Sequence, residues 1–108
     1  MAKDFCHPKV VAGYDDHIRQ LIPGYELMHA QVRATLSVHL PPHAHILIVG
    51  CGTGYEIEYL LADFPEIQIT AVDPSLTMLE KAQQKIAEHA GKSRVNWIHG
   101  TTADLKLE

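Results

Sequence analysis

The sequence predicts an α/β fold in which a parallel sheet is flanked by helices, and two segments carry this prediction. Residues 46–49 form an apolar run that ends at alternating glycines, and the residues that follow have the 3.6-residue spacing of an amphipathic helix. A second apolar run, residues 67–72, ends in the acid Asp73. Short apolar strands that alternate with helical segments are typical of parallel sheets, whose strands are covered by helices.

Helical and extended segments alternate along the whole chain. In order, we expect a flexible start (1–13), a short helix (15–22), a turn at Pro23-Gly24, a helix (25–39), a strand (46–49), a helix (55–63), a strand (67–72), a helix (75–90) and a strand (95–99). Proline and glycine punctuate these segments, since proline ends helices and glycine commonly follows them. The three strands are expected to be parallel in the order 3-2-1, with right-handed crossovers.

The glycines Gly50, Gly52 and Gly54 predict a ligand-binding turn. Glycine adopts positive φ and lets a ligand lie against the main chain, while the start of the following helix offers unpaired N–H groups to an anion. Tyr55 stands where a dinucleotide-binding G-x-G-x-x-G loop has its third glycine, which disfavours NAD. Asp73, at the tip of the second strand, is placed to accept hydrogen bonds from ribose hydroxyls.

With these motifs the chain resembles the class I S-adenosylmethionine-dependent methyltransferases. The resemblance rests on residues 46–54, 71–79 and 95–105, in the family's order and spacing, and less distinctively on residues 14–25. It implies a Rossmann-like parallel sheet, here incomplete because strands 1–3 of seven are present. Residues 1–44 are expected to form an N-terminal helical leader, and residues 45–108 the N-terminal half of the cofactor-binding domain.

The resemblance assigns S-adenosylmethionine as cofactor. Its contacts are expected from Gly50, Cys51, Gly52, Thr53, Gly54, Asp73, Pro74, Met78, Thr101, Thr102 and Tyr14. By resemblance the glycine loop faces the methionine portion, Asp73 the ribose, and Met78 and the two threonines the adenine. Two family acids are replaced here, one by Ile48 and one by Thr101, and the second replacement removes a charged acceptor for the adenine amino group.

The expected activity is methyl transfer to a small-molecule acceptor by the parent protein. No catalytic residue is assigned, because the fourth strand and the acceptor side would lie beyond these 108 residues. The chain is therefore expected to be an N-terminal fragment without activity of its own. The alternative is a non-catalytic module that binds S-adenosylmethionine, a nucleotide or another protein.

Without the fourth strand, the outer edge of strand 46–49 would be open. We expect this edge to pair with the same edge of a second copy.

Composition excludes several other classes of function. Nine lysines and arginines are outnumbered by thirteen acids, which makes a nucleic-acid partner unlikely. No apolar run approaches the roughly 20 residues of a membrane span, and there is no secretory segment. Cys6 and Cys51 suggest no disulfide framework, so a cytoplasmic setting is expected.

Two further residue groups have a structural interpretation. His39, His43 and His45 cluster in the sequence without metal-ligand spacing, and we expect exposed loop histidines and no metal site. A stripe on helix 25–39 is expected to pack on the sheet; its members are Tyr25, Met28, Val32 and Leu36.

Overall fold

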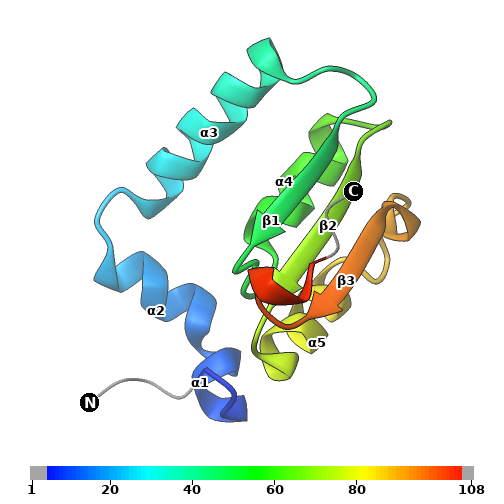
Figure 1. Ribbon diagram of the computed structural model, residues 1–108. Coiled ribbons are helices and arrows are strands. Elements are labelled where there is room, and N and C mark those ends of the chain that lie inside the picture. The colour runs from blue at the N-terminus through cyan, green and yellow to red at the C-terminus, as the bar shows by residue number, and fades with distance from the viewer. Residues whose placement is uncertain (1–4, 106–108) are drawn as a thin grey trace.

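The computed structural model describes residues 5–105 and contains one sheet of three parallel strands (Figure 1). The strands are β1 (His45–Val49), β2 (Gln68–Asp73) and β3 (Val95–His99), and β2 lies between the other two. The α/β fold class, the strand order and the strand directions are thereby confirmed. Because all three strands are parallel, their carboxyl ends lie at the same edge of the sheet, where Val49 and Asp73 precede the two loops of interest.

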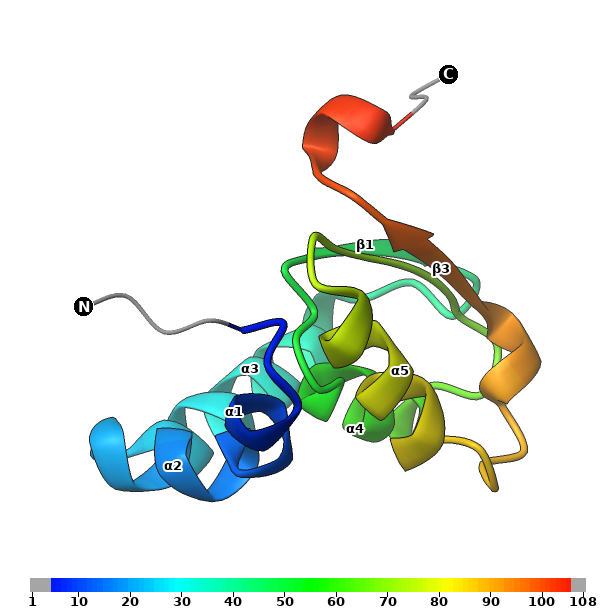
Figure 2. The same cartoon turned by 90° about the horizontal axis from the view of Figure 1, so that it is seen from below.

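Two helices cover one face of the sheet. Figure 2 shows α4 (Tyr55–Asp63) and α5 (Leu76–Lys85) on the same side of the strands. The core between the helices and the sheet is apolar, and its largest fully buried side chains are Ile57, Leu61, Ile67 and Ile69. The amphipathic spacing of Ile57, Leu60, Leu61 and Phe64 predicts the buried face of α4. This face is confirmed, because the first three are buried and Phe64 packs against the core.

The helix predicted over 75–90 is shorter in the structure. α5 ends at Lys85, and Ile86 is its C-cap. His89 then directs a turn, because its Nδ1 accepts the Gly91 N–H at 2.9 Å. The 3₁₀ helix η1 (Lys92–Arg94) leads into β3. The apolar face of α5 is complete once Ile86 is buried, and Ala90 is exposed.

The opposite face of the sheet carries exposed apolar side chains. Alternation along β1 turns Leu47 and Val49 away from the helices, and they are 44% and 55% exposed. Among residues 5–105, no strand pairs with the outer edge of β1. This edge is the one for which self-association is predicted.

The leader forms three helices on the β1 side of the molecule (Figure 1). They are α1 (Pro8–Ala12), α2 (Tyr14–Leu21) and α3 (Tyr25–His39). The prediction of a flexible segment over residues 1–13 is wrong for the described part from residue 5 on. His7 caps α1 by accepting the Lys9 N–H at 3.2 Å, and Pro8 occupies its first turn, both favourable helix-starting features.

The predicted packing stripe of α3 is only partly confirmed. Tyr25 does pack, although against α4, since its ring centre lies 5.8 Å from that of Tyr55. Met28 and Val32 are 46% and 39% exposed, so the predicted packing stripe is wrong at these positions, although Leu36 does pack against the core. The contacting face carries His29 and Arg33 instead. His29 is 4% exposed, and the Arg33 guanidinium donates to both carboxylate oxygens of a residue at the end of α4, Asp63, at 2.7 and 2.8 Å.

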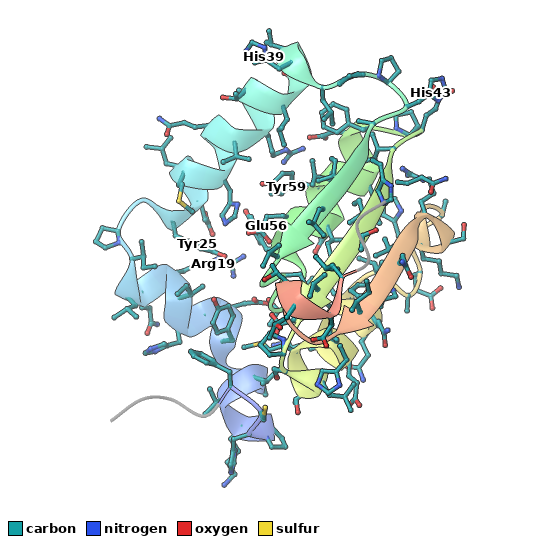
Figure 3. The ribbon with its side chains drawn as sticks, viewed as in Figure 1. Arg19, Tyr25, His39, His43, Glu56 and Tyr59 are labelled. Atoms are coloured by element: carbon teal, nitrogen blue, oxygen red, sulfur yellow. The ribbon has the colours of Figure 1, made fainter. Side chains whose placement is uncertain are left out.

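The three clustered histidines lie at the surface. Figure 3 shows His39 and His43 at the end of the molecule away from Arg19 and Tyr25. His43 lies 3.3 Å from Glu66, and all three histidines are exposed, as predicted. The prediction of loop positions holds for His43 alone, because His39 ends α3 and His45 begins β1. Across residues 5–105, no group of three or more histidine, cysteine or acidic side chains is arranged to hold a metal ion. Over the same range, no helix is long and apolar enough to cross a membrane.

Candidate cofactor site

The loop from β1 to α4 adopts left-handed backbone conformations at each of its glycines. Gly50, Gly52 and Gly54 have φ of 70°, 55° and 83°. A Cβ at Gly50 or Gly52 would meet nothing within 4 Å, so their main chain is open to a ligand. A Cβ at Gly54 would lie 2.9 Å from that of Ala82, so this glycine permits close packing of the loop against α5.

Asp73 fastens this loop to the end of β2. One carboxylate oxygen accepts the Gly52 N–H at 2.9 Å, and the other accepts the Ser75 N–H at 2.8 Å. Ser75 in turn caps α5, since its hydroxyl accepts the Met78 N–H at 3.1 Å. A carboxylate offers about four acceptor positions, so two remain for a ligand. Asp73 is 7% exposed, which restricts a partner to one direction of approach.

A cavity of about 360 Å³ lies against these two loops. Its lining includes six of the predicted cofactor residues, namely Tyr14, Gly50, Gly52, Asp73, Pro74 and Met78. Three further lining residues were not predicted, namely Phe5, Cys6 and Ser75. Phe5 and Cys6 fall in the segment expected to be flexible, and no pattern in the sequence links them to the distant glycine loop. Ser75 shows a detectable signal, because serine directly before an amphipathic helix is a typical N-cap.

The other predicted cofactor residues do not line the cavity. Cys51 and Thr53 are 3% and 2% exposed and lie within the loop beside Gly54. Thr101 and Thr102 lie at the start of the 3₁₀ helix η2 (Thr102–Asp104) and are exposed. Their contact with adenine stays a prediction.

Thr101 stands where the family often has an acid, but another acid lies beside it. The carboxylate of Asp104 accepts the Thr101 N–H at 2.7 Å in a capping box. A Cβ on Gly100 would collide with this carboxylate, which shows how closely the turn folds. The acid missing at position 101 is thus near in space, three residues later in the chain.

Burial and nearby carboxylates raise the pKa of two groups near the cavity, Cys51 and Tyr14. Burial, Asp73 and Glu56 together raise the pKa of the Cys51 thiol to about 12, so it is a thiol and not a thiolate near neutral pH. Burial and the charge of Glu56 also raise the pKa of Tyr14. Neither group therefore acts as a nucleophile or base at neutral pH.

An aromatic and charged cluster joins the leader to α4 beside the cavity. Figure 3 shows Arg19 and Tyr25 of the leader near Glu56 and Tyr59 of α4. The Tyr59 hydroxyl shares a hydrogen bond of 3.2 Å with His29, and the Arg19 guanidinium lies 5.7 Å from the centre of the Tyr55 ring. Burial raises the pKa of Tyr25 and that of Tyr59 to about 12. This cluster escaped prediction because its partners are about 30 residues apart.

Part of this chain is similar in sequence to a known protein family. A family model described as a methyltransferase domain matches residues 46–108, more than half of the chain. The chain belongs to the class I methyltransferase family. The match begins at β1 and includes the glycine loop and Asp73.

Several relatives extend the comparison. A malonyl-[acyl-carrier protein] O-methyltransferase of Priestia megaterium is 44% identical over 63 residues, which are 58% of this chain and 22% of the relative. A carboxy-S-adenosyl-L-methionine synthase of Shewanella woodyi is 27% identical over 108 residues, covering 97% of this chain and 44% of the relative. The methyltransferase chain thus spans less than half the length of these relatives.

Solved structures share the fold. That of an S-adenosyl-L-methionine-dependent methyltransferase assigned in Methanococcus maripaludis superposes with a TM-score of 0.67 at 23% identity, over 100% of this chain and 48% of the other. A methyltransferase of Geobacter sulfurreducens in complex with S-adenosyl-L-homocysteine gives a TM-score of 0.53 at 27% identity, over 69% of this chain and 27% of the other.

Proposed function

We propose that the whole protein transfers a methyl group from S-adenosylmethionine to a small-molecule acceptor, and that the residues described here supply its cofactor site. The observation that carries the proposal is the glycine loop, clamped by Asp73 and open toward a cavity of about 360 Å³. Family membership and the Geobacter relative in complex with S-adenosylhomocysteine support the same ligand class.

The residues of the cavity suit the chemical parts of this cofactor. The exposed main chain of Gly50 and Gly52 suits its methionine portion, and the free acceptor positions of Asp73 suit the two ribose hydroxyls. Pro74 and Met78 offer apolar surface for a flat base. Thr101 and Thr102 are assigned to the adenine side by resemblance.

The bound cofactor supplies an activated methyl group on a sulfonium, so the protein has to orient it and keep it in place. Tyr14 lines the same cavity from the leader and is proposed to shield the bound cofactor from water there. No general base is assigned at this site, because Tyr14, which lines the cavity, and Cys51, in the adjacent loop, both have raised pKa values.

We also propose self-association through the β1 edge in a cytoplasmic protein. Leu47 and Val49 are exposed beside an edge that is unpaired within residues 5–105. Two copies could pair these edges antiparallel about a two-fold axis. Sedimentation of the chain and of Val49→Lys tests this, because a monomer in both cases at micromolar concentration would contradict the proposal.

Titration calorimetry tests the cofactor assignment. We expect S-adenosylmethionine and S-adenosylhomocysteine to bind more tightly than NAD or ATP. Asp73→Ala should weaken binding by about 1–3 kcal/mol, the value of hydrogen bonds to a charged group. Asp16→Ala is the matched control, because the Asp16 side chain is 91% exposed. Tighter binding of NAD than of S-adenosylhomocysteine would falsify the assignment.

Asp73 also holds the glycine loop, so its replacement requires a folding control. Asp73→Asn retains an oxygen for one of the two backbone N–H groups, from Gly52 or Ser75. If the variant melts at a temperature close to that of the chain without substitutions (below, the parent chain) but binds the ligand more weakly, the loss of affinity is due to ligand contacts. Unchanged binding by both variants would reduce Asp73 to a structural cap.

A further inference from the structure

The carboxylate of Asp15 joins three segments that lie far apart in the sequence. Its Oδ1 accepts the hydroxyl of Thr53 in the glycine loop at 2.5 Å. Its Oδ2 accepts from the ammonium of Lys85, at the end of α5, at 2.8 Å. Lys85 also lies 3.4 Å from the Thr53 hydroxyl, so the three side chains form a closed set of contacts.

This junction is shielded from water. Thr53 is 2% exposed, and the side chains of Lys85 and Asp15 are 18% and 24% exposed. Burial by itself raises the pKa of Asp15, but the hydrogen bonds from Lys85 and Thr53, together with the positive charges of Lys85 and Lys81, bring the pKa below its ordinary value of 3.8. Asp15 is therefore ionised near neutral pH, and charge-assisted hydrogen bonds of this kind are the stronger ones.

In other contacts between the leader and α5, the leader contributes backbone carbonyls and α5 contributes side chains. Thr77 donates its hydroxyl to the carbonyl of Cys6 at 2.8 Å, and Lys81 donates to the carbonyls of Val11 and Ala12 at 2.9 and 3.0 Å. These contacts attach α1 to α5. The contact of Asp15 differs from them because it also reaches the glycine loop.

Asp15 also directly follows Tyr14, which lines the cavity together with Gly50 and Gly52. A single carboxylate thus ties a leader residue at the cavity to the loop on its other side. Loss of the carboxylate would release both sides and leave Lys85 partly buried without its anionic partner, which is costly.

We propose that Asp15 is a positioning residue that couples docking of the leader to the conformation of the glycine loop, and thereby sets the affinity of the cavity for its ligand. The naming of that ligand rests on the proposed function. Coupling is reciprocal, so a ligand that binds the ordered loop tightens the leader by the same factor by which the docked leader tightens the ligand.

Hydrogen exchange measured by mass spectrometry tests the coupling, first without ligand. Asp15→Asn should raise the exchange rate of peptides from α2 and of peptides from the glycine loop, each by about tenfold, the equivalent of one charged hydrogen bond. Asp16→Asn, which changes an exposed acid one position away, should leave both sets of peptides at parent rates.

The Thr53 variants separate coupling from a general loss of packing. Thr53→Ser keeps the hydroxyl and should exchange like the parent in α2. Thr53→Val keeps the shape and should raise exchange in α2, although the change lies in the other segment. Equal rates in α2 for both variants, or faster exchange in only one of the two segments for Asp15→Asn, would overturn the coupling.

Addition of S-adenosylhomocysteine completes the test. In the parent chain it should slow exchange in α2 as well as in the loop, and Asp15→Asn should bind it about tenfold more weakly, in line with the loss of one charged hydrogen bond. Parent-like affinity in Asp15→Asn would overturn the role in ligand binding. If the parent chain binds no S-adenosylhomocysteine, the proposed function fails, while the ligand-free comparison still decides whether Asp15 couples the two segments.

Discussion

The leader and the sheet domain are held in place by different forces. Between residues 45 and 105 the core is built from apolar side chains of α4, α5 and the strands, such as Ile57 and Ile69, both fully buried. In the described leader, Val11 is the buried apolar side chain, whereas seven large apolar side chains are exposed, namely Phe5, Leu21, Ile22, Leu27, Met28, Val32 and Val38. Polar and aromatic contacts attach most of the leader instead, and the partly buried Leu36 and Leu40 add apolar contacts near its end. We infer that it can open while the domain stays folded.

The largest expected effect is on the stability of the domain. Leu61→Ala should lower the free energy of unfolding by about 2–5 kcal/mol, because it leaves a cavity beneath the sheet. Val38→Ala is the matched leader variant; Val38 is 77% exposed, and its replacement should change stability by no more than about 0.5 kcal/mol. Denaturation in urea measures both. Equal losses would contradict the contrast between the two regions.

The next effect compares two glycines with nearly the same backbone. Gly24 precedes α3 with φ of 78° and open space around its Cβ position, so Gly24→Ala should cost about 1–2 kcal/mol of left-handed strain. Gly54→Ala carries the same strain and also the collision with Ala82, about 1–3 kcal/mol more. Thermal unfolding followed by circular dichroism measures the difference. Equal melting temperatures would contradict this prediction, because they would mean that α5 moves away from a side chain at position 54 without loss of stability.

A smaller effect concerns the pH dependence of leader docking. The pKa of Asp15 is lowered in the folded chain, so its contribution is present above the ordinary value of 3.8 and is lost as the pH falls through the lower folded value. The charged groups that face it are Lys85 and Lys81, and Tyr14 is the adjacent titratable group.

Exchange protection in α2, corrected for intrinsic rates, measures this loss. It should fall with pH below about 4 in the parent chain, where the domain core is still protected. Asp15→Asn should lack this step. A parent profile that matches that of Asp15→Asn would contradict the assignment to this carboxylate.

The smallest effect is a difference in thiol reactivity between the two regions. Iodoacetamide at mildly alkaline pH should modify the exposed Cys6 of the leader and leave Cys51 unmodified, because Cys51 is 3% exposed and burial raises its pKa to about 12. Peptide mapping identifies the modified residue. Because Cys6 lines the cavity, S-adenosylhomocysteine should slow its modification. Faster modification of Cys51 than of Cys6 would contradict the burial of the loop.

The same contrast explains what the sequence could predict. The strands, the glycine loop and Asp73 carry local signals: apolar runs, glycines where φ is positive, and an acid at the end of a strand. Most of the cavity lining follows from these signals, because parallel strands place their carboxyl ends together. Helix α1 also has local signals, Pro8 and Gly13 at its two ends, although the segment 1–13 is expected from the sequence to be flexible.

The attachment of the leader could not be predicted in this way. Asp15 meets its partners 38 and 70 residues later in the chain, and an acid in the first turn of a helix has an ordinary explanation in the helix dipole. Similarly, the spacing of Met28 and Val32 suggests a packing face, whereas the structure uses His29 and Arg33. Such choices depend on which charged and aromatic partners the fold brings together.

One measurement tests the central claim most directly, namely that the glycine loop, the end of β2 and the leader form one ligand site. In a two-dimensional ¹H–¹⁵N NMR titration with S-adenosylhomocysteine, we expect the largest amide shifts at residues 50–54 and 73–78 and at Tyr14. NAD at the same concentration should cause smaller shifts. Shifts confined to the outer surface of α3, or larger shifts with NAD than with S-adenosylhomocysteine, would contradict the account.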